Sequence, residues 1–301
     1  MNKKVIIVCP YYETGGPESL HQVCHAINNM GGDAYIWYFG ENHSEPHPAY
    51  RKYNLKLTST LEDNENTIII LPECEGKMIN MFSKAKVYFW WLSVDNNNFF
   101  QYNNSFDNPR VHHLYQSYYA LHFLLNNNAI YYQPLFDYIN DEFIKESLTV
   151  GYDNKENIVC YNPRKGLEYT EQIIKMTPGV NFVPLINMSR EQVIDTLKKS
   201  KIYIDFGFHP GKDKFPREAA LMNNCVIAGF RGSAMFYNDV PIDPLKYKFN
   251  LNDLSLIPSV IKDCLDNYDE RIKDFKNYKD VVLNQKEEAT NHIKQIFGLN
   301  V

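Results

Sequence analysis

The 301-residue sequence predicts an α/β fold built from two doubly wound parallel-sheet domains. Short apolar runs alternate with segments of helical periodicity along most of the chain, which is the pattern of buried parallel strands joined by crossover helices. A polar and weakly periodic stretch at residues 136–157 interrupts this alternation, which then starts again. We therefore expect a first domain over residues 1–140, a linker, and a second domain over residues 155–284.

The first domain opens with an apolar run at residues 5–9 that ends at Pro10 and predicts a buried strand. Gly15-Gly16-Pro17 follows, and Pro17 suits the start of a helix that is expected to reach Met30. The remaining elements are predicted by the same periodicity: strands at 34–39, 67–71, 86–92 and 111–115, and a helix at 117–125. Trp90 and Trp91 should point to opposite faces of their strand, so at least one is a core residue.

The second domain repeats the alternation. Ser189 is expected to cap one of its helices, because a serine hydroxyl can accept from the free N–H groups of a first turn. The predicted strands are 158–161, 180–184, 201–206 and 225–228, and the predicted helices are 166–176, 190–198, 215–222, 254–268 and 287–297.

Composition limits the classes of partner. A net charge of -5 and a sequence pI of about 6.0 argue against a general nucleic-acid binder. The six cysteines show no C-x-x-C pair, and Cys9, Cys160 and Cys225 are expected to be buried thiols in a reducing compartment. No apolar stretch has the length of a membrane span or a signal-peptide core. We therefore expect a cytoplasmic protein, and contact with the inner face of a membrane stays open.

The most informative segment begins at Gly211-Lys212 and continues through Arg217-Glu218-Ala219-Ala220, a buried strand at 225–228, and Gly232-Ser233. It reads as loop, helix, strand and glycine turn. Upstream, Arg164-Lys165-Gly166 lies between a predicted strand and a predicted helix. Basic side chains beside helix N-termini suit a phosphate group.

This order of motifs resembles the retaining, nucleotide-sugar-dependent glycosyltransferases of the family-4 kind, which have the GT-B fold. The resemblance implies two Rossmann-like domains facing across a cleft, the first for the acceptor and the second for the nucleotide sugar. It also implies that a final helix, here at about residues 285–301, packs back on the first domain. Enzymes of this fold use cationic side chains and helix dipoles instead of a metal, so no metal ligands are expected.

The resemblance also implies roles for individual residues. Arg164 and Lys165 would bind the donor diphosphate, and Glu218 the ribose hydroxyls. Gly232 and Ser233 would form the glycine turn next to the donor, and Gly15 and Gly16 a loop that approaches its phosphate. The family has a second glutamate eight residues before Glu218, where this chain has Pro210; Lys212 is then a candidate substitute contact.

The acceptor side is less well marked. Asp95, at the end of the strand predicted over residues 86–92, and Glu13, just before Gly15, are candidate catalytic bases if the anomeric configuration inverts. The predicted function is transfer of a sugar from a UDP- or GDP-linked donor to a glycan or lipid-linked acceptor, as in bacterial-type surface polysaccharide synthesis. A sugar-nucleotide epimerase on the same fold and a non-catalytic glycan- or partner-binding module are the alternatives.

Overall fold

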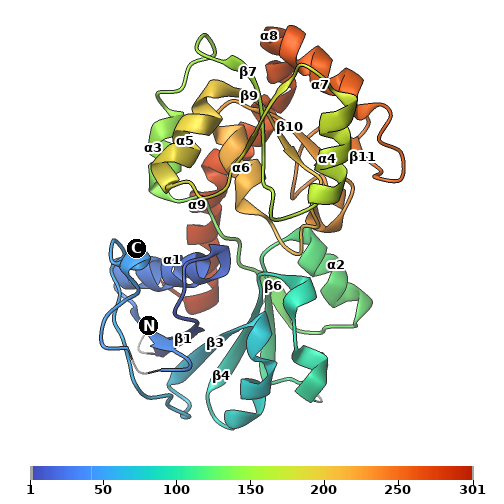
Figure 1. Ribbon diagram of the computed structural model, residues 1–301. Coiled ribbons are helices and arrows are strands. Elements are labelled where there is room, and N and C mark those ends of the chain that lie inside the picture. The colour runs from blue at the N-terminus through green and yellow to red at the C-terminus, as the bar shows by residue number, and fades with distance from the viewer. Residues whose placement is uncertain (1–2, 42, 103, 300–301) are drawn as a thin grey trace. The chain divides into compact units, whose positions relative to one another are not determined.

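The computed structural model describes residues 3–41, 43–102 and 104–299. The chain divides into two compact units, the first formed by residues 1–138 and 286–301 and the second by residues 139–285. Each unit is a parallel sheet with helices on both faces (Figure 1). The predicted α/β architecture of two doubly wound sheets is therefore confirmed.

Unit 1 contains a sheet of six parallel strands in the order β2-β1-β3-β4-β5-β6. The strands are β1 (Lys4–Cys9), β2 (Asp33–Tyr38), β3 (Thr67–Pro72), β4 (Lys86–Trp91), β5 (Val111–Tyr115) and β6 (Tyr132–Pro134). The connections include the helices α1 (Gly15–Asn29) and α2 (Tyr118–Asn126) and the 3-10 segments η1 (Pro48–Tyr50), η2 (Glu73–Met81), η3 (Val94–Asn96) and η4 (Phe99–Tyr102). Ser117 caps α2, its hydroxyl accepting from the Ala120 N–H at 3.1 Å.

The strands of unit 1 supply two cores, because alternate side chains point to opposite faces of the sheet. Val5 and Ile7 pack with α1 and the end of α9 (Lys276–Phe297), whereas Ile6 and Val8 pack with η2 and α2. Trp90 and Trp91 follow this rule, and both are fully buried. Their indole N–H groups donate to the Leu135 carbonyl and to His113 Nδ1, at 2.9 and 3.1 Å. Neither tryptophan is therefore available to stack on a sugar.

Unit 2 contains a sheet of five parallel strands in the order β11-β10-β9-β7-β8. The strands are β7 (Glu156–Tyr161), β8 (Asn181–Pro184), β9 (Ser200–Asp205), β10 (Cys225–Gly229) and β11 (Lys248–Phe249). The helical segments are α3 (Asp141–Ser147), α4 (Leu167–Met176), α5 (Arg190–Lys199), α6 (Lys214–Leu221), η5 (Gly232–Met235), α7 (Ile257–Asp266), α8 (Tyr268–Arg271) and η6 (Ile272–Phe275). Helices α3, α5 and α6 lie on one face of the sheet, and α4 and α7 on the other (Figure 1).

Local signals explain several ends in unit 2. Ser189 and Gln192 form a reciprocal capping box at the start of α5, as expected from the serine.

The predicted thiols Cys9, Cys160 and Cys225 form no disulfide and are fully buried. No helix among the described residues is both long enough and apolar enough to cross a bilayer.

The stretch at residues 136–157 is more ordered than its polar composition indicates. It contains α3, whose first turn is capped by the Asn140 side chain, and Phe143 of this helix is 2% exposed. Phe143 packs in the core of unit 2. Residues 141–147 of the stretch expected to be a linker thus form a short helix, which has no apolar periodicity of its own and is anchored by one buried aromatic residue.

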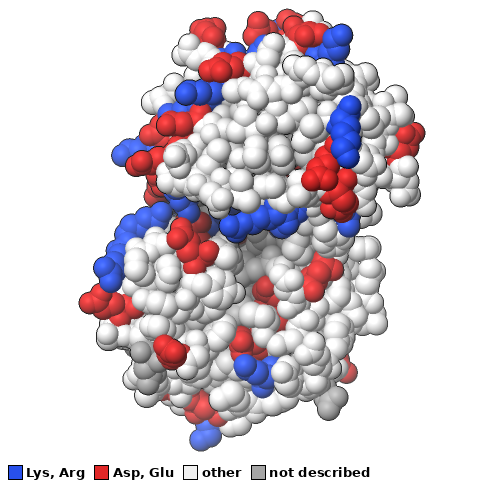
Figure 2. Space-filling view, viewed as in Figure 1, with Lys and Arg blue, Asp and Glu red and all other residues white. Residues whose placement is uncertain are grey.

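On the face shown in Figure 2, large uncharged areas separate short groups of acidic and basic side chains. This distribution agrees with a chain whose charges of both signs nearly balance.

If α3 belongs to the core, Phe143→Ala should destabilise the protein by about 3–5 kcal/mol, the usual cost of removing a buried phenyl group. Urea unfolding followed by far-UV circular dichroism measures the change. Leu148→Ala is the matched control, because Leu148 directly follows α3 and is 75% exposed. Equal losses in the two variants would show that α3 is not part of the core.

Candidate functional site

The candidate site of unit 2 lies where the strand order reverses. The chain leaves β7 toward β8 on one side, and β9 lies on the other side of β7. Ligands of open α/β sheets bind outside the carboxyl ends of the strands at such a point. The segments that follow β7, β9 and β10 meet here, at residues 162–166, 206–213 and 230–233.

Two glycines permit these segments to touch through their backbones. Gly166 has φ +62°, and a Cβ atom there would lie 2.4 Å from the Phe206 carbonyl carbon. Gly232 has φ +57°, and its Cβ atom would lie 2.0 Å from the His209 carbonyl oxygen. Both the positive φ and the absence of space therefore require glycine. The role of Gly232 that is visible in the structure is to allow the turn after β10 to pack on the segment after β9.

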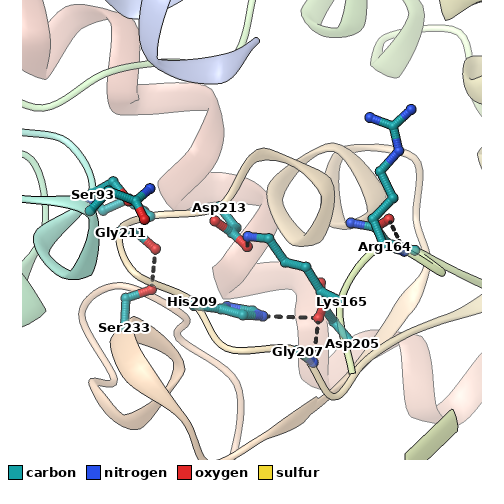
Figure 3. Close-up of polar contacts among 12 residues, drawn as sticks. Ser93, Arg164, Lys165, Asp205, Gly207, His209, Gly211, Asp213 and Ser233 are labelled. Carbon is teal, nitrogen blue, oxygen red and sulfur yellow. Dashed lines mark hydrogen bonds and ion pairs between the residues drawn. The ribbon is translucent and has the colours of Figure 1, made fainter. Parts of the chain in front are cut away.

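Hydrogen bonds complete this junction. The Ser233 N–H donates to the His209 carbonyl at 2.8 Å, and the Ser233 hydroxyl donates to the Gly211 carbonyl at 2.6 Å (Figure 3). Ser233 is fully buried. Its hydroxyl thus holds the 206–213 segment in place.

Lys165 lies in this network. Its Nζ atom is 2.5 Å from Asp213 Oδ2, and the lysine side chain is 35% exposed. Arg164 is exposed, and its side chain extends away from the network, whereas Lys165 points into it (Figure 3). The two residues predicted as a basic pair therefore have different surroundings.

The other predicted donor contacts lie in and before α6. Lys212 is 6% exposed, with its Nζ atom 4.0 Å from Asp239 Oδ1. Glu218 lies in the second turn of α6 and is 7% exposed. Lys212 and Glu218 thus both belong to the stretch that runs from the end of β9 into α6.

Three ionisable residues of this segment were not predicted: Asp205, His209 and Arg217. Asp205 ends β9, and its carboxylate accepts from the Tyr203 hydroxyl at 2.9 Å and from the Gly207 N–H at 3.0 Å. His209 is fully buried, with Nε2 3.1 Å from Asp205 Oδ1 (Figure 3). An aspartate that directly ends a buried strand is a signal that the sequence does contain.

Charge fixes the protonation of this pair. Burial alone would lower the pKa of His209, but the Asp205 and Asp213 carboxylates outweigh it and raise the pKa above its usual 6.5. Burial likewise opposes ionisation of Asp205, but the charge of His209 and the donated hydrogen bonds hold the pKa of this carboxyl below its usual value. Asp205, His209, Asp213 and Lys165 thus form two neighbouring pairs of opposite charge.

Arg217 stabilises the end of the 206–213 segment through hydrogen bonds to its backbone carbonyls. It is fully buried; Nε donates to the Asp213 carbonyl at 3.1 Å, and the guanidinium also donates to the Lys212 carbonyl at 2.7 Å and to Gln285 Oε1 at 2.9 Å. Gln285 lies 68 residues further along the chain. No local pattern predicts this partner.

One group of side chains has the composition of a metal site. Asp205, His209 and Asp213 each offer one ligand atom, and these atoms lie within 4.8 Å of one another. In the structure the Lys165 ammonium contacts Asp213, and Asp205 already accepts two hydrogen bonds. A divalent cation would therefore compete with Lys165 and with protonation of His209. The i,i+4 histidine pairs His21/His25 and His43/His47 lie in unit 1.

The predicted residues of unit 1 lie at the carboxyl end of its sheet. Gly15 and Gly16 begin α1, and Thr14 before them is held by the Tyr50 hydroxyl, which donates to the Thr14 carbonyl at 3.1 Å. Glu13 is exposed. Asp95 in η3 is also exposed and accepts from the Tyr119 hydroxyl at 3.1 Å.

A scan against protein-family models gives no match, and neither does a sequence search of curated proteins. The fold does match solved structures. Sucrose-phosphate synthase from Thermosynechococcus elongatus superimposes with a TM-score of 0.72 at 11% identity over 98% of both chains. HepE of Anabaena, solved with UDP-glucose, gives a TM-score of 0.68 at 10% identity over 98% of this chain and 99% of that chain.

A glycosyltransferase from Rickettsia africae gives a TM-score of 0.65 at 13% identity over the whole of both chains. Matches of this extent establish the fold, which is the GT-B fold of glycosyltransferases. The GT-B fold predicted from the sequence is therefore confirmed.

If backbone contact at Gly232 holds the site together, Gly232→Ala should destabilise unit 2 by clearly more than the cost of a positive φ, which is about 1–2 kcal/mol. Gly179→Ala is the matched control, because Gly179 has φ +85° with no atom within 4 Å of the added Cβ. Urea unfolding followed by circular dichroism compares them. Equal losses would mean that the contact at Gly232 relaxes easily.

The raised pKa of His209 predicts a pH dependence. Asp205, Asp213 and Lys165 are the charged groups around it. Because its folded-state pKa lies above 6.5, its contribution to stability is complete below pH 6.5 and is lost as the pH rises through the folded-state value. The stability lost in His209→Gln should therefore be largest near pH 6 and should shrink at higher pH, by at most about 1.4 kcal/mol per pH unit.

His113 provides the opposite control. Burial lowers its pKa to about 4, so its contribution is present above pH 6.5 and is lost as the pH falls. All three tryptophans lie in unit 1, so tryptophan fluorescence measures the unfolding of the His113→Gln variant. Circular dichroism measures the unfolding of the His209→Gln variant. Parallel pH profiles for the two variants would refute a charged His209.

Proposed function

We propose that this chain is a glycosyltransferase that transfers a sugar from a UDP- or GDP-sugar, bound by unit 2, to a glycan or lipid-linked acceptor bound by unit 1. The observation that carries the proposal is the junction after β7, β9 and β10, where the Lys165 ammonium and the start of α4 lie at the point of strand reversal. Anionic diphosphates bind at such places in α/β sheets. The UDP-glucose found in the HepE structure supports the same class of ligand.

In this proposal, Arg164, Lys165 and Lys212 neutralise the charge that develops on the departing nucleoside diphosphate, which is the main catalytic task of such a transfer. Glu218 accepts hydrogen bonds from the ribose hydroxyls. Gly232 and Ser233 hold the loop that the donor approaches. Gly15 and Gly16 lie at the start of α1, where a phosphate or an acceptor can approach the backbone closely.

The exposed carboxylates of Asp95 and Glu13 are proposed to contact hydroxyls of the acceptor. The cationic side chains of unit 2 do the electrostatic work that a metal does in other transferases, so the reaction is proposed to be metal-independent. A role in surface polysaccharide synthesis, in the cytoplasm at the inner face of a membrane, is the biological setting that we propose for it.

Replacement of Lys165 tests the donor site. Lys165→Ala should weaken UDP binding by about 1.5–3 kcal/mol, the range for a hydrogen bond to a charged group, and the Asp213 carboxylate left behind would repel the diphosphate further. Isothermal titration calorimetry with UDP and with GDP measures this loss. Lys175→Ala is the matched control, because Lys175 is an exposed lysine in the last turn of α4.

The same titration in the presence of EDTA tests whether UDP binding requires a divalent cation. Unchanged affinity of the wild-type protein is expected if Lys165 provides the cation. Loss of binding in EDTA, with Lys165→Ala unaffected, would instead assign the diphosphate to a metal held by Asp205, His209 and Asp213.

A further inference from the structure

Unit 1 has its own point of strand reversal, and a carboxylic acid lies at it. The chain leaves β1 toward β2 on one side, and β3 lies on the other side of β1. The segments after β1 and β3 are therefore those that flank a ligand in an open α/β sheet. Gly15 and Gly16 belong to the first, and Glu73 is the first residue of the second.

Glu73 is 7% exposed. The Leu92 N–H, at the end of β4, donates to Glu73 Oε2 at 3.2 Å, and the Asn98 N–H donates to the Glu73 carbonyl at 3.2 Å. A Cβ atom on Gly16 would contact Leu92 Cδ1 at 3.9 Å, so the start of α1 packs against the residue that binds the glutamate. The carboxyl is thus fixed by backbone groups next to the diglycine loop.

The charge of Glu73 has no cationic partner within the described parts of the chain, and this distinguishes it from its neighbour. Glu75 is also buried, but its Oε2 lies 3.3 Å from Lys77 Nζ. A buried carboxylate without a cation is destabilising. A role in proton transfer explains why a site would keep a buried carboxyl that has no structural ion pair.

The electrostatic surroundings suit proton transfer near neutral pH. Burial raises the pKa of Glu73 to about 7, against the opposing effect of backbone N–H groups at Glu73, Leu92 and Ser93. The titratable groups that face it are Cys74, next in η2, and Tyr12, in the segment after β1. Burial raises the pKa of the Cys74 thiol to about 12 and raises the pKa of the Tyr12 hydroxyl above its usual value. Both groups are therefore neutral at pH 7.

We propose that Glu73 is the residue of unit 1 that takes the proton from the acceptor hydroxyl during sugar transfer. This inference rests on the proposed function, with transfer that inverts the anomeric configuration, the case in which a protein base is needed. In the step, the acceptor O–H bond breaks and its proton moves to the Glu73 carboxylate, while the acceptor oxygen forms a bond to the anomeric carbon. The bond between that carbon and the phosphate oxygen breaks, and its electron pair leaves with the nucleoside diphosphate. Asp95 and Glu13 then contact the acceptor without taking the proton.

The test uses UDP-glucose as the donor and water as the acceptor, with UDP release as the signal. In the wild-type chain the rate should rise with pH through about 7, because the base acts as a carboxylate. Glu73→Gln should lower the rate by about 10²-fold or more and should abolish this rise, since general bases contribute about 10²–10⁴-fold. UDP affinity measured by calorimetry should not change.

Glu75→Gln is the matched control, since it removes a buried carboxyl of the same element that is already paired with Lys77. It should retain both the rate and the pH profile. Glu73→Gln activity within threefold of the wild-type rate, or a pH profile that survives the substitution, would overturn the inference. Failure of the wild-type chain to bind UDP or GDP would overturn the proposed function instead, which keeps the two failures distinct.

A direct titration of Glu73 tests the proposed role in two further cases. One is a wild-type protein that binds UDP but releases no UDP to water, and the other is a Glu73→Gln variant that does not fold. In the wild-type chain labelled with ¹³C at glutamate carboxyls, Glu73 should titrate near pH 7, and glucose added to the UDP-bound protein should shift that midpoint. A midpoint below 5, or one that glucose leaves unchanged, would contradict the role.

Discussion

The candidate site depends on one constraint: three segments at the carboxyl ends of β7, β9 and β10 pack backbone against backbone. Gly166 and Gly232 make this packing sterically feasible, and hydrogen bonds from Ser233 to the His209 and Gly211 carbonyls fix it. Arg217 then holds the Lys212 and Asp213 carbonyls from below. As a result, the 206–213 segment is supported from two sides before any ligand arrives, and such preorganisation reduces the ordering cost of binding.

The two units treat charge differently at equivalent places in their sheets. At the reversal point of unit 2, the carboxylates of Asp205 and Asp213 are matched by His209 and Lys165, and the nearby turns also carry Arg164, Lys212 and Arg231. At the reversal point of unit 1, the Glu73 carboxylate has only backbone donors among the residues that the structure describes. A cationic site suits an anionic diphosphate, and a carboxyl that can exchange a proton suits a hydroxyl. This difference agrees with the proposed division between donor and acceptor.

The sequence predicted those features that have a local cause. Apolar runs located all strands except β6 and β11, which have three and two residues, too few for a period to be recognised. Lys165 was named as a site candidate from its place between a strand and a helix, and Gly232 from the family resemblance; their roles toward a donor stay predictions. Arg217 was not, because its partner Gln285 comes from a distant part of the chain. The buried state of Glu73 was missed because burial of a residue after a strand is decided by η2 and the end of β4, which the apolar pattern alone does not place.

The central claim, that unit 2 binds a nucleotide sugar through the segments after β7, β9 and β10, is tested most directly by hydrogen–deuterium exchange of the whole chain with and without UDP. Binding should slow amide exchange at residues 162–167, 206–218 and 230–235, because a bound ligand stabilises the segments that contact it. The amino-end turns of the same sheet, such as residues 177–180, should not change. Exchange that is unaffected at all three segments at saturating UDP, or protection confined to those amino-end turns, would contradict the account.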